Sequence, residues 1–125
     1  MILMIDDDPE ISQAIKRRLS RYRVEVLQAY HGTHGIWLAM TEEPDVVITD
    51  LRMPQGQGQH VVERLKSSPE TRHIPIIVLT GLFDEELERR LWKLGIDEYF
   101  TKPVNFEDLR KAVARFVELE EKSAY

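Results

Sequence analysis

Residues 2–9 read Ile-Leu-Met-Ile-Asp-Asp-Asp-Pro, four apolar residues followed at once by three carboxylates. A short run that is continuously apolar is typical of a strand buried on both faces, as in a parallel sheet. Residues 46–49 and 74–79 form two more runs of this kind, each next to a polar residue or a proline. Residues 24–29 and 98–101 are further strand candidates. Five strands are therefore predicted.

Apolar residues recur at helical spacing after each of these strands, which predicts one amphipathic helix in each position. The stripes are Ile11, Ala14, Ile15 and Leu19; Ile36, Ala39 and Met40; Val61, Val62 and Leu65; Leu87, Leu91 and Leu94; and Leu109, Val113, Phe116 and Val117. Strict alternation of strand and helix implies right-handed crossovers and a parallel sheet covered on both sides. The predicted fold class is α/β: a flavodoxin-like, doubly wound (βα)5 sandwich of three layers, with a five-stranded parallel sheet in the order 2-1-3-4-5.

The composition fits one globular domain over residues 1–125, with 42% hydrophobic and 31% charged residues. Residues 117–125 are expected to end the last helix, and could begin a linker to an effector domain in a longer protein. A net charge of −5 argues against direct nucleic-acid binding and against attachment to an anionic membrane. The lack of cysteine excludes disulfides and thiolate chemistry. Without a long apolar run or a basic leader, a cytoplasmic location is expected.

Polar side chains follow four of the predicted strands: Asp6, Asp7 and Asp8; Asp50; Thr80; and Lys102. In doubly wound sheets, ligands lie outside the carboxyl ends of the strands. Taken singly, Thr80 could merely end a strand and Lys102 could be a solvated charge. Their expected meeting with carboxylates at one rim is what favours a functional site.

The three adjacent acids are expected to have different roles. Asp8 followed by Pro9 is typical of a helix N-cap and first helical position. Asp6 and Asp7 would lie with Asp50, where two like charges about 4 Å apart repel by roughly 4 kcal/mol at an effective dielectric constant near 20. Such a cluster requires a cation, and oxygen ligands without His or Cys favour Mg²⁺, or Mn²⁺ in its place.

Asp50 is the candidate nucleophile, because a carboxylate can form an acyl phosphate when cations neutralise the incoming phosphoryl oxygens. Lys102 would supply such a positive charge. The hydroxyl of Thr80 could donate to the same oxygens, and in-line transfer requires little else from a protein besides positioning and electrostatics.

Four segments together resemble the receiver domains of response regulators, the CheY-like family. They read ILMIDDDP (2–9), VITDLRMP (47–54), VLTG (78–81) and YFTKPV (99–104), and they span the whole chain in the family's order. The resemblance implies a phosphorylation switch of a two-component system rather than an enzyme that acts on other substrates. Asp50 would be the phosphoacceptor, served by a sensor histidine kinase, a phosphotransfer protein or a small phosphodonor. A downstream effector protein or domain would read the change.

The resemblance also implies roles for individual residues. Asp6, Asp7, Asp50 and the backbone carbonyl of Arg52 would hold Mg²⁺, with Asp7 as a direct ligand. Thr80 and Lys102 would bind the phosphoryl group, and Tyr99 would change rotamer on activation. The Lys102–Pro103 peptide bond would be cis. The chain departs from the family pattern at Gln55 and Ile96, which leaves the shape of the neighbouring loops open.

The output surface is expected on the last two helices and the strand between them. Trp92, Arg89, Lys93 and Asp97 are candidate partner contacts there, together with Arg90 and Glu98, although a basic helix face is more often simply solvated. Family members that dimerise through this surface would place an arginine where this chain has Ala112. A monomer or a weak, phosphorylation-dependent dimer is therefore expected.

Several alternatives were weaker. His31 and His34 have ligand-like spacing but no third ligand nearby, and Gly56 and Gly58 lack the lysine of a phosphate-binding loop. A phosphatase with an aspartyl intermediate would need a second acid two residues after Asp50. A degenerate receiver that only binds proteins would have lost an acid, the threonine or the lysine. A receiver module within a larger regulator or hybrid kinase remains open.

Overall fold

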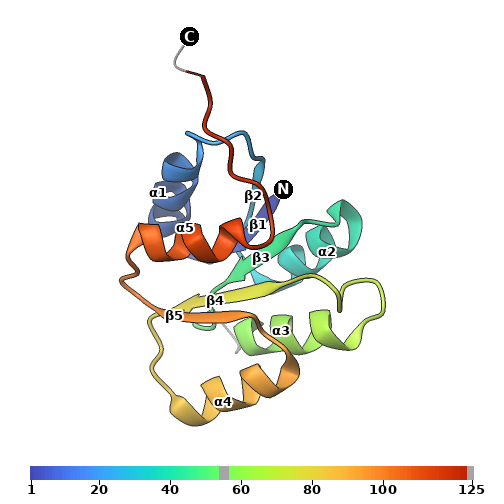
Figure 1. Ribbon diagram of the computed structural model, residues 1–125. Coiled ribbons are helices and arrows are strands. Elements are labelled where there is room, and N and C mark those ends of the chain that lie inside the picture. The colour runs from blue at the N-terminus through green and yellow to red at the C-terminus, as the bar shows by residue number, and fades with distance from the viewer. Residues whose placement is uncertain (54–56, 124–125) are drawn as a thin grey trace.

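The computed structural model describes residues 1–53 and 57–123, in which five strands alternate with five helices (Figure 1). The strands are β1 (Ile2–Ile5), β2 (Val26–Ala29), β3 (Val46–Thr49), β4 (Ile76–Thr80) and β5 (Glu98–Thr101). The helices are α1 (Pro9–Leu19), α2 (Gly32–Glu42), α3 (Gln57–Ser67), α4 (Glu85–Leu94) and α5 (Phe106–Ala114). Residues 54–56, which include Gln55 and Gly56, lie outside the described part.

All neighbouring strands pair in parallel, in the order β2-β1-β3-β4-β5, so the predicted flavodoxin-like fold is confirmed. β2 and β4 each begin two residues later than predicted. The reason is local: the N–H of Val24 bonds to the carbonyl of Tyr22, and that of Ile74 to the carbonyl of Thr71, so both residues belong to turns. The register pairs Ile5 with Thr49 and Thr80 with Thr101, which brings the carboxyl ends of β1, β3, β4 and β5 to one rim.

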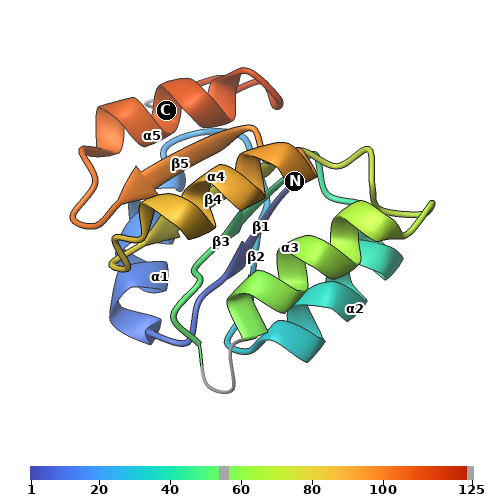
Figure 2. The ribbon, with the colours of Figure 1, turned by 90° about the horizontal axis from the view of Figure 1, so that it is seen from below.

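Helices cover both faces of the sheet (Figure 2). Alternate strand residues face opposite sides, as in β1, where Leu3 and Ile5 pack with α2, α3 and α4 while Ile2 and Met4 pack with α1 and α5. The side chains of β1, β3 and β4 are buried throughout. This explains why these strands read as unbroken apolar runs.

Glycines allow two helices to approach the sheet. A Cβ atom on Gly35 of α2 would lie 2.4 Å from the Ile5 side chain. One on Gly58 of α3 would lie 2.3 Å from the Cα of Leu51 and 2.5 Å from the carbonyl oxygen of Asp50. Gly58 therefore lets the first turn of α3 pack directly on the backbone that follows β3.

The prediction that residues 117–125 end the last helix is wrong. α5 ends at Ala114, and residues 118–122 form an extended C-terminal strap that runs antiparallel to residues 21–23. The N–H of Arg23 donates to the carbonyl of Glu120, and that of Lys122 to the carbonyl of Arg21, both at 2.8 Å. Leu119 of the strap packs on the core beneath α1 and α5. These tertiary contacts outweigh the helix propensity of residues 118–122, which are Glu-Leu-Glu-Glu-Lys.

Three residues of the predicted helical stripes lie at the surface: Ala14 is exposed, and Met40 and Leu94 are each 41% exposed. Among the described residues, no helix is long and apolar enough to cross a membrane.

Candidate functional site

The site lies where β1 and β3 end. The N–H of Asp6 donates to the carbonyl of Ala29 at 3.0 Å, and the N–H of Asp50 donates to the carbonyl of Ile5 at 2.9 Å. Parallel hydrogen bonding therefore continues one residue past both strands. Since the backbone of both acids is anchored in this way, their side chains leave the sheet side by side.

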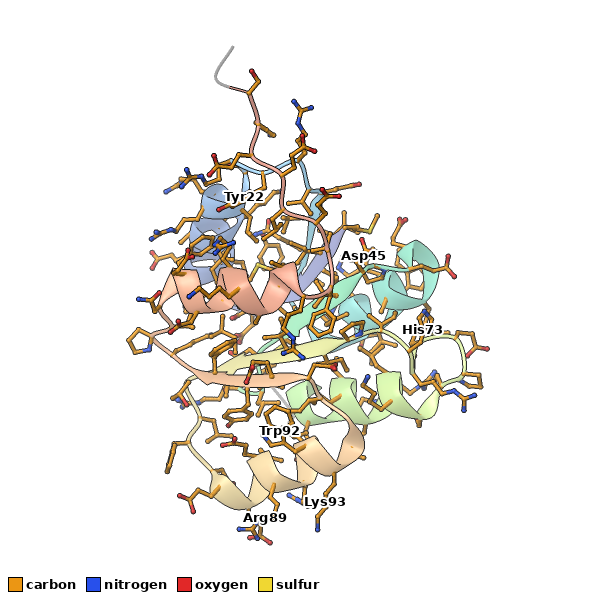
Figure 3. The ribbon with its side chains drawn as sticks, in the orientation of Figure 1. Tyr22, Asp45, His73, Arg89, Trp92 and Lys93 are labelled. Atoms are coloured by element: carbon orange, nitrogen blue, oxygen red, sulfur yellow. The ribbon has the colours of Figure 1, made fainter. Side chains whose placement is uncertain are left out.

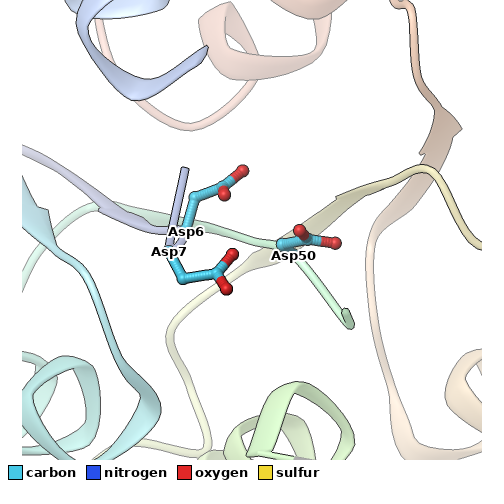
Figure 4. A group of neighbouring side chains, drawn as sticks. All are labelled: Asp6, Asp7 and Asp50. Carbon is cyan, nitrogen blue, oxygen red and sulfur yellow. The ribbon is translucent and has the colours of Figure 1, made fainter. Parts of the chain in front are cut away.

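Asp6, Asp7 and Asp50 form a carboxylate cluster whose nearest oxygens all lie within 4.8 Å of one another (Figure 4). Asp6 and Asp50 are 2% and 5% exposed, whereas Asp7 is open to solvent. Three carboxylates this close, with one facing water, form a group that could bind a metal ion. Hard oxygen donors alone suit Mg²⁺ or Mn²⁺ better than Zn²⁺.

Lys102 contacts two of these acids from the end of β5. Its Nζ lies 2.8 Å from Oδ2 of Asp6 and 3.2 Å from Oδ2 of Asp50. The N–H of Lys102 donates to the carbonyl of Thr80 at 2.7 Å, and the Lys102–Pro103 peptide bond is cis. The ammonium offsets part of the repulsion between the acids, and charge-assisted hydrogen bonds of this type are stronger than neutral ones.

The two buried acids differ in their proton affinity. Burial raises the pKa of Asp6, because the hydrogen bonds from Lys102 and Asp8 offset desolvation only in part. Burial also acts to raise the pKa of Asp50, but the Arg52 N–H, the Thr80 hydroxyl and Lys102 together hold that pKa below its ordinary value. Burial acts to lower the pKa of Lys102, yet contacts with Asp6 and Asp50 raise it overall. Asp50 is therefore held ionised, as a nucleophile requires.

Hydrogen bonds fix the orientation of the Asp50 side chain. Its Oδ1 accepts from the N–H of Leu51 at 2.7 Å and from that of Arg52 at 3.0 Å. Its Oδ2 accepts from Lys102. The hydroxyl of Thr80, which is fully buried, is among the groups that lower the pKa of Asp50. One oxygen is thus held by the backbone, while the other faces the ammonium.

Asp8 caps α1, as its sequence position predicts. Its side chain accepts from the N–H groups of Glu10 at 2.9 Å and Ile11 at 3.5 Å, and Pro9 begins the helix. Its own N–H donates to Oδ1 of Asp6 at 2.9 Å. Asp8 therefore supports the cluster through its backbone and is not one of the three grouped carboxylates.

Leu82 is a residue of this site that sequence reasoning missed. The hydroxyl of Tyr99 donates to its carbonyl at 2.9 Å, and its own N–H donates to the Thr80 hydroxyl at 3.2 Å. Both contacts use the backbone of Leu82. No side-chain pattern could therefore have revealed them.

The candidate partner residues separate into two groups. Trp92, Arg89 and Lys93 are exposed; Arg89 and Lys93 extend from the outer side of α4, whereas Trp92 lies nearer β5 (Figure 3). Asp97 instead forms a hydrogen bond within the protein, since its Oδ2 accepts from the N–H of Ile76 at 3.0 Å.

The two histidines of α2 stand apart from the carboxylate cluster. His31 accepts the N–H of His34 at 3.4 Å as the N-cap of α2, and their rings lie 5.7 Å apart. Neither belongs to the group of possible metal ligands among the described residues.

The doubly wound fold and its acid-lined rim define a class of phosphoryl-accepting regulatory domains, and comparison with known proteins agrees. The response regulator receiver domain family matches residues 2–114, so the chain belongs to this family. As a receiver domain of two-component signalling, it is a regulatory phosphoacceptor module rather than a conventional enzyme.

Curated relatives include short and long proteins. Protein PilH of Pseudomonas aeruginosa is 36% identical over 114 residues, covering 90% of this chain and 93% of PilH. Hybrid signal transduction histidine kinase D of Dictyostelium discoideum is 37% identical over 119 residues, or 95% of this chain, but the match spans only 7% of that kinase. The chain spans 45% of the DNA-binding regulator RpaA of Synechocystis, at 36% identity over 86% of this chain.

Solved structures show the same architecture. The chemotaxis protein CheY4 of Vibrio cholerae superposes with a TM-score of 0.83 at 28% identity, covering 93% of this chain and 97% of CheY4. A receiver domain protein of Clostridium thermocellum superposes with a TM-score of 0.82 at 37% identity, covering 91% and 90%.

Proposed function

We propose that Asp50 accepts a phosphoryl group and that the domain works as a phosphorylation-dependent signalling switch. The donor is the phosphohistidine of a sensor histidine kinase or a phosphotransfer protein, or a small phosphodonor. The observation that carries the proposal is the environment of Asp50: an almost buried carboxylate held ionised beside an ammonium, a hydroxyl and two further acids.

A divalent cation, Mg²⁺ or Mn²⁺, completes this site. The fit rests on the donor set, since three carboxylates reach a common point and the exposed Asp7 leaves one side open for water and a phosphate oxygen. Asp6, Asp7, Asp50 and the backbone carbonyl of Arg52 would hold the ion. When bound, the ion supplies positive charge to the phosphoryl oxygens.

The chain's own residues carry the transfer. An oxygen of Asp50 forms the new bond to phosphorus as the phosphorus–nitrogen bond of the donor phosphohistidine breaks, and the imidazole nitrogen leaves with the electron pair. The N–H groups of Leu51 and Arg52 orient the nucleophile. Lys102 and Thr80 then bind the oxygens of the transferred group, which is the main requirement of phosphoryl transfer.

The output follows from the contacts of Thr80. If its hydroxyl turns toward the phosphoryl group, it releases the N–H of Leu82 and thereby loosens the segment that Tyr99 also contacts. The surface formed by α4, β5 and α5 then changes shape, and an effector protein or domain reads it. Because relatives include hybrid kinases and DNA-binding regulators, the domain is proposed to act either alone or as the receiver module of a longer protein.

Mass spectrometry of the intact protein after incubation with acetyl phosphate and Mg²⁺ tests the proposal. The wild type and Asp108→Asn, a change at an exposed acid of α5, should each gain one phosphoryl group, whereas Asp50→Asn should gain none. A phosphoryl group on Asp50→Asn to the wild-type extent would rule out the assignment.

A further inference from the structure

A groove of about 280 Å³ lies between α3 and α4, on the face of the molecule where these two helices run beside each other (Figure 2). Its lining consists of Gln59 and Glu63 from α3 and Arg90, Leu91, Lys93 and Leu94 from α4. None of these residues takes part in the carboxylate site.

The groove has an apolar floor that continues to the surface. Leu91 is fully buried beneath it, and Leu94 is 41% exposed beside it. Leu94 is the third member of the apolar stripe of α4 and the last residue of that helix. The groove therefore offers an uncovered leucine next to a buried one.

Two cations border the groove without ion-pair partners. Arg90 and Lys93 are exposed and lie on the same side of α4 as Leu94, three and four residues apart along the helix. Neither forms an ion pair with any residue that the structure describes. Glu63 on the opposite wall accepts instead from Nε2 of Gln59 at 3.0 Å.

Toward β5 and α5, several polar side chains have partners within the protein. Nε1 of Trp92 donates to Glu88 at 3.1 Å, and Arg115 pairs with Glu98 at 3.8 Å. Asp97 binds the backbone of Ile76. In a chain of net charge −5, Arg90 and Lys93 place positive charge beside the exposed Leu94 on the α3 side of α4.

We propose that the α3–α4 groove binds an acidic protein segment that packs one apolar side chain on Leu94 and places carboxylates on Arg90 and Lys93. The partner is therefore a peptide segment in which an apolar residue is flanked by Asp or Glu. This goes beyond the phosphorylation switch, because the contact requires neither Mg²⁺ nor a phosphoryl group.

The test uses short fluorescein-labelled peptides with a central Leu or Phe flanked by Glu, and fluorescence anisotropy with the unphosphorylated protein in EDTA. The Glu peptides should bind, and replacing Glu by Lys or the central residue by Ser should weaken binding. The double variant Arg90→Glu, Lys93→Glu should lose at least about tenfold in affinity, as expected for removed charge contacts. Leu94→Ser should also bind more weakly.

A matched control separates this site from general charge attraction. The double variant Arg17→Glu, Lys111→Glu changes the net charge by the same amount on α1 and α5, and should bind the Glu peptides like the wild type. Amide chemical-shift mapping on the wild-type protein should place the largest changes at Glu63 and at 90–94. Failure of the Glu peptides to bind, an equal loss in the control variant, or shift changes centred on α1 or α5 would each overturn the proposal. Asp50→Asn should keep peptide binding, so the two proposals can fail separately.

Discussion

The hydroxyl of Tyr99 and the hydroxyl of Thr80 bind the same residue, one through the carbonyl and the other through the N–H of Leu82. The Thr80 hydroxyl also helps to lower the pKa of Asp50, whereas Tyr99 lies on β5. Leu82 therefore connects a residue that acts on the acid cluster with the strand beside α4. Any change in the Thr80 hydroxyl must alter the same backbone segment that holds Tyr99.

Tyr99→Phe should lower the free energy of unfolding by about 1 kcal/mol, because a partly buried hydrogen bond to the Leu82 carbonyl is lost. Tyr30→Phe is the control, since its hydroxyl binds Gln28 at the surface and should contribute less. Urea unfolding measures both. Equal losses in the two variants would contradict a special role for the Tyr99 contact.

Adjacent acids should respond differently to Mg²⁺. Asp8→Ala should cost about 1 kcal/mol of stability through loss of the α1 cap, without changing Mg²⁺ affinity. Asp7→Ala should weaken Mg²⁺ binding and reduce the rise in melting temperature that Mg²⁺ produces in the wild type. Calorimetric titration and thermal unfolding measure these effects. Unchanged Mg²⁺ affinity in Asp7→Ala would remove Asp7 from the ligand set.

Lys102→Met should destabilise the metal-free protein by roughly 1–3 kcal/mol, because Asp6 and Asp50 lose their shared ammonium. Mg²⁺ should restore most of this loss, since it supplies positive charge to the same carboxylates. Thermal unfolding in EDTA and in Mg²⁺ makes the comparison. The control is Lys111→Met, which changes an exposed lysine of α5 and should show neither effect. If Mg²⁺ stabilised Lys102→Met no more than it stabilises the wild type, this account would be contradicted.

The contribution of Asp6 to the free energy of unfolding of the metal-free protein should rise as the pH falls from neutral into the acid range. Burial raises the pKa of Asp6 above its ordinary value of 3.8, so the folded protein binds this proton more tightly than the unfolded chain. Asp6 therefore destabilises the fold at neutral pH, and the effect is relieved as pH falls through the raised pKa. The lowered pKa of Asp50 acts oppositely: its contribution is present above 3.8 and is lost as pH falls through its folded-state pKa.

The variant Asp6→Asn isolates this effect. In urea unfolding with EDTA, from neutral pH to about pH 4, the wild type should gain stability relative to Asp6→Asn. Parallel pH profiles for the two proteins would show that Asp6 has an ordinary pKa.

The C-terminal strap should contribute through its apolar residue more than through its surface ion pair. Leu119→Ala should cost about 1 kcal/mol, because Leu119 packs on the core beneath α1 and α5. Arg21→Ala removes an exposed pair with Glu121 at 3.1 Å and should cost less than about 0.5 kcal/mol. Urea unfolding distinguishes them. A neutral Leu119→Ala would favour a helix that continues past Ala114 into solvent.

The local sequence pattern was sufficient to predict those parts of the fold in which a residue type strongly favours one structural position. Short, fully apolar runs such as Ile2–Ile5 are typical of strands buried on both faces, and alternation with amphipathic helices then leaves few parallel topologies. The carboxyl ends of parallel strands share a rim, so the sequence alone predicts that Asp6, Asp7 and Asp50 form a group. The Asp8 cap follows from the same local chemistry.

Tertiary structure decided the features that depend on contacts between distant segments. The sequence of the strap favours a helix. The strap is extended instead because its backbone bonds to residues 21–23 and Leu119 packs on the core, contacts that a helix in solvent would lack. Leu94 fits the apolar stripe of α4 but is exposed, and the side chain of Asp97 binds the backbone N–H of Ile76. The link from Thr80 to Tyr99 runs through peptide groups of Leu82, which every residue carries. Such contacts depend on where the folded chain places each group. Neither the periodicity of the sequence nor the type of a residue predicts that position.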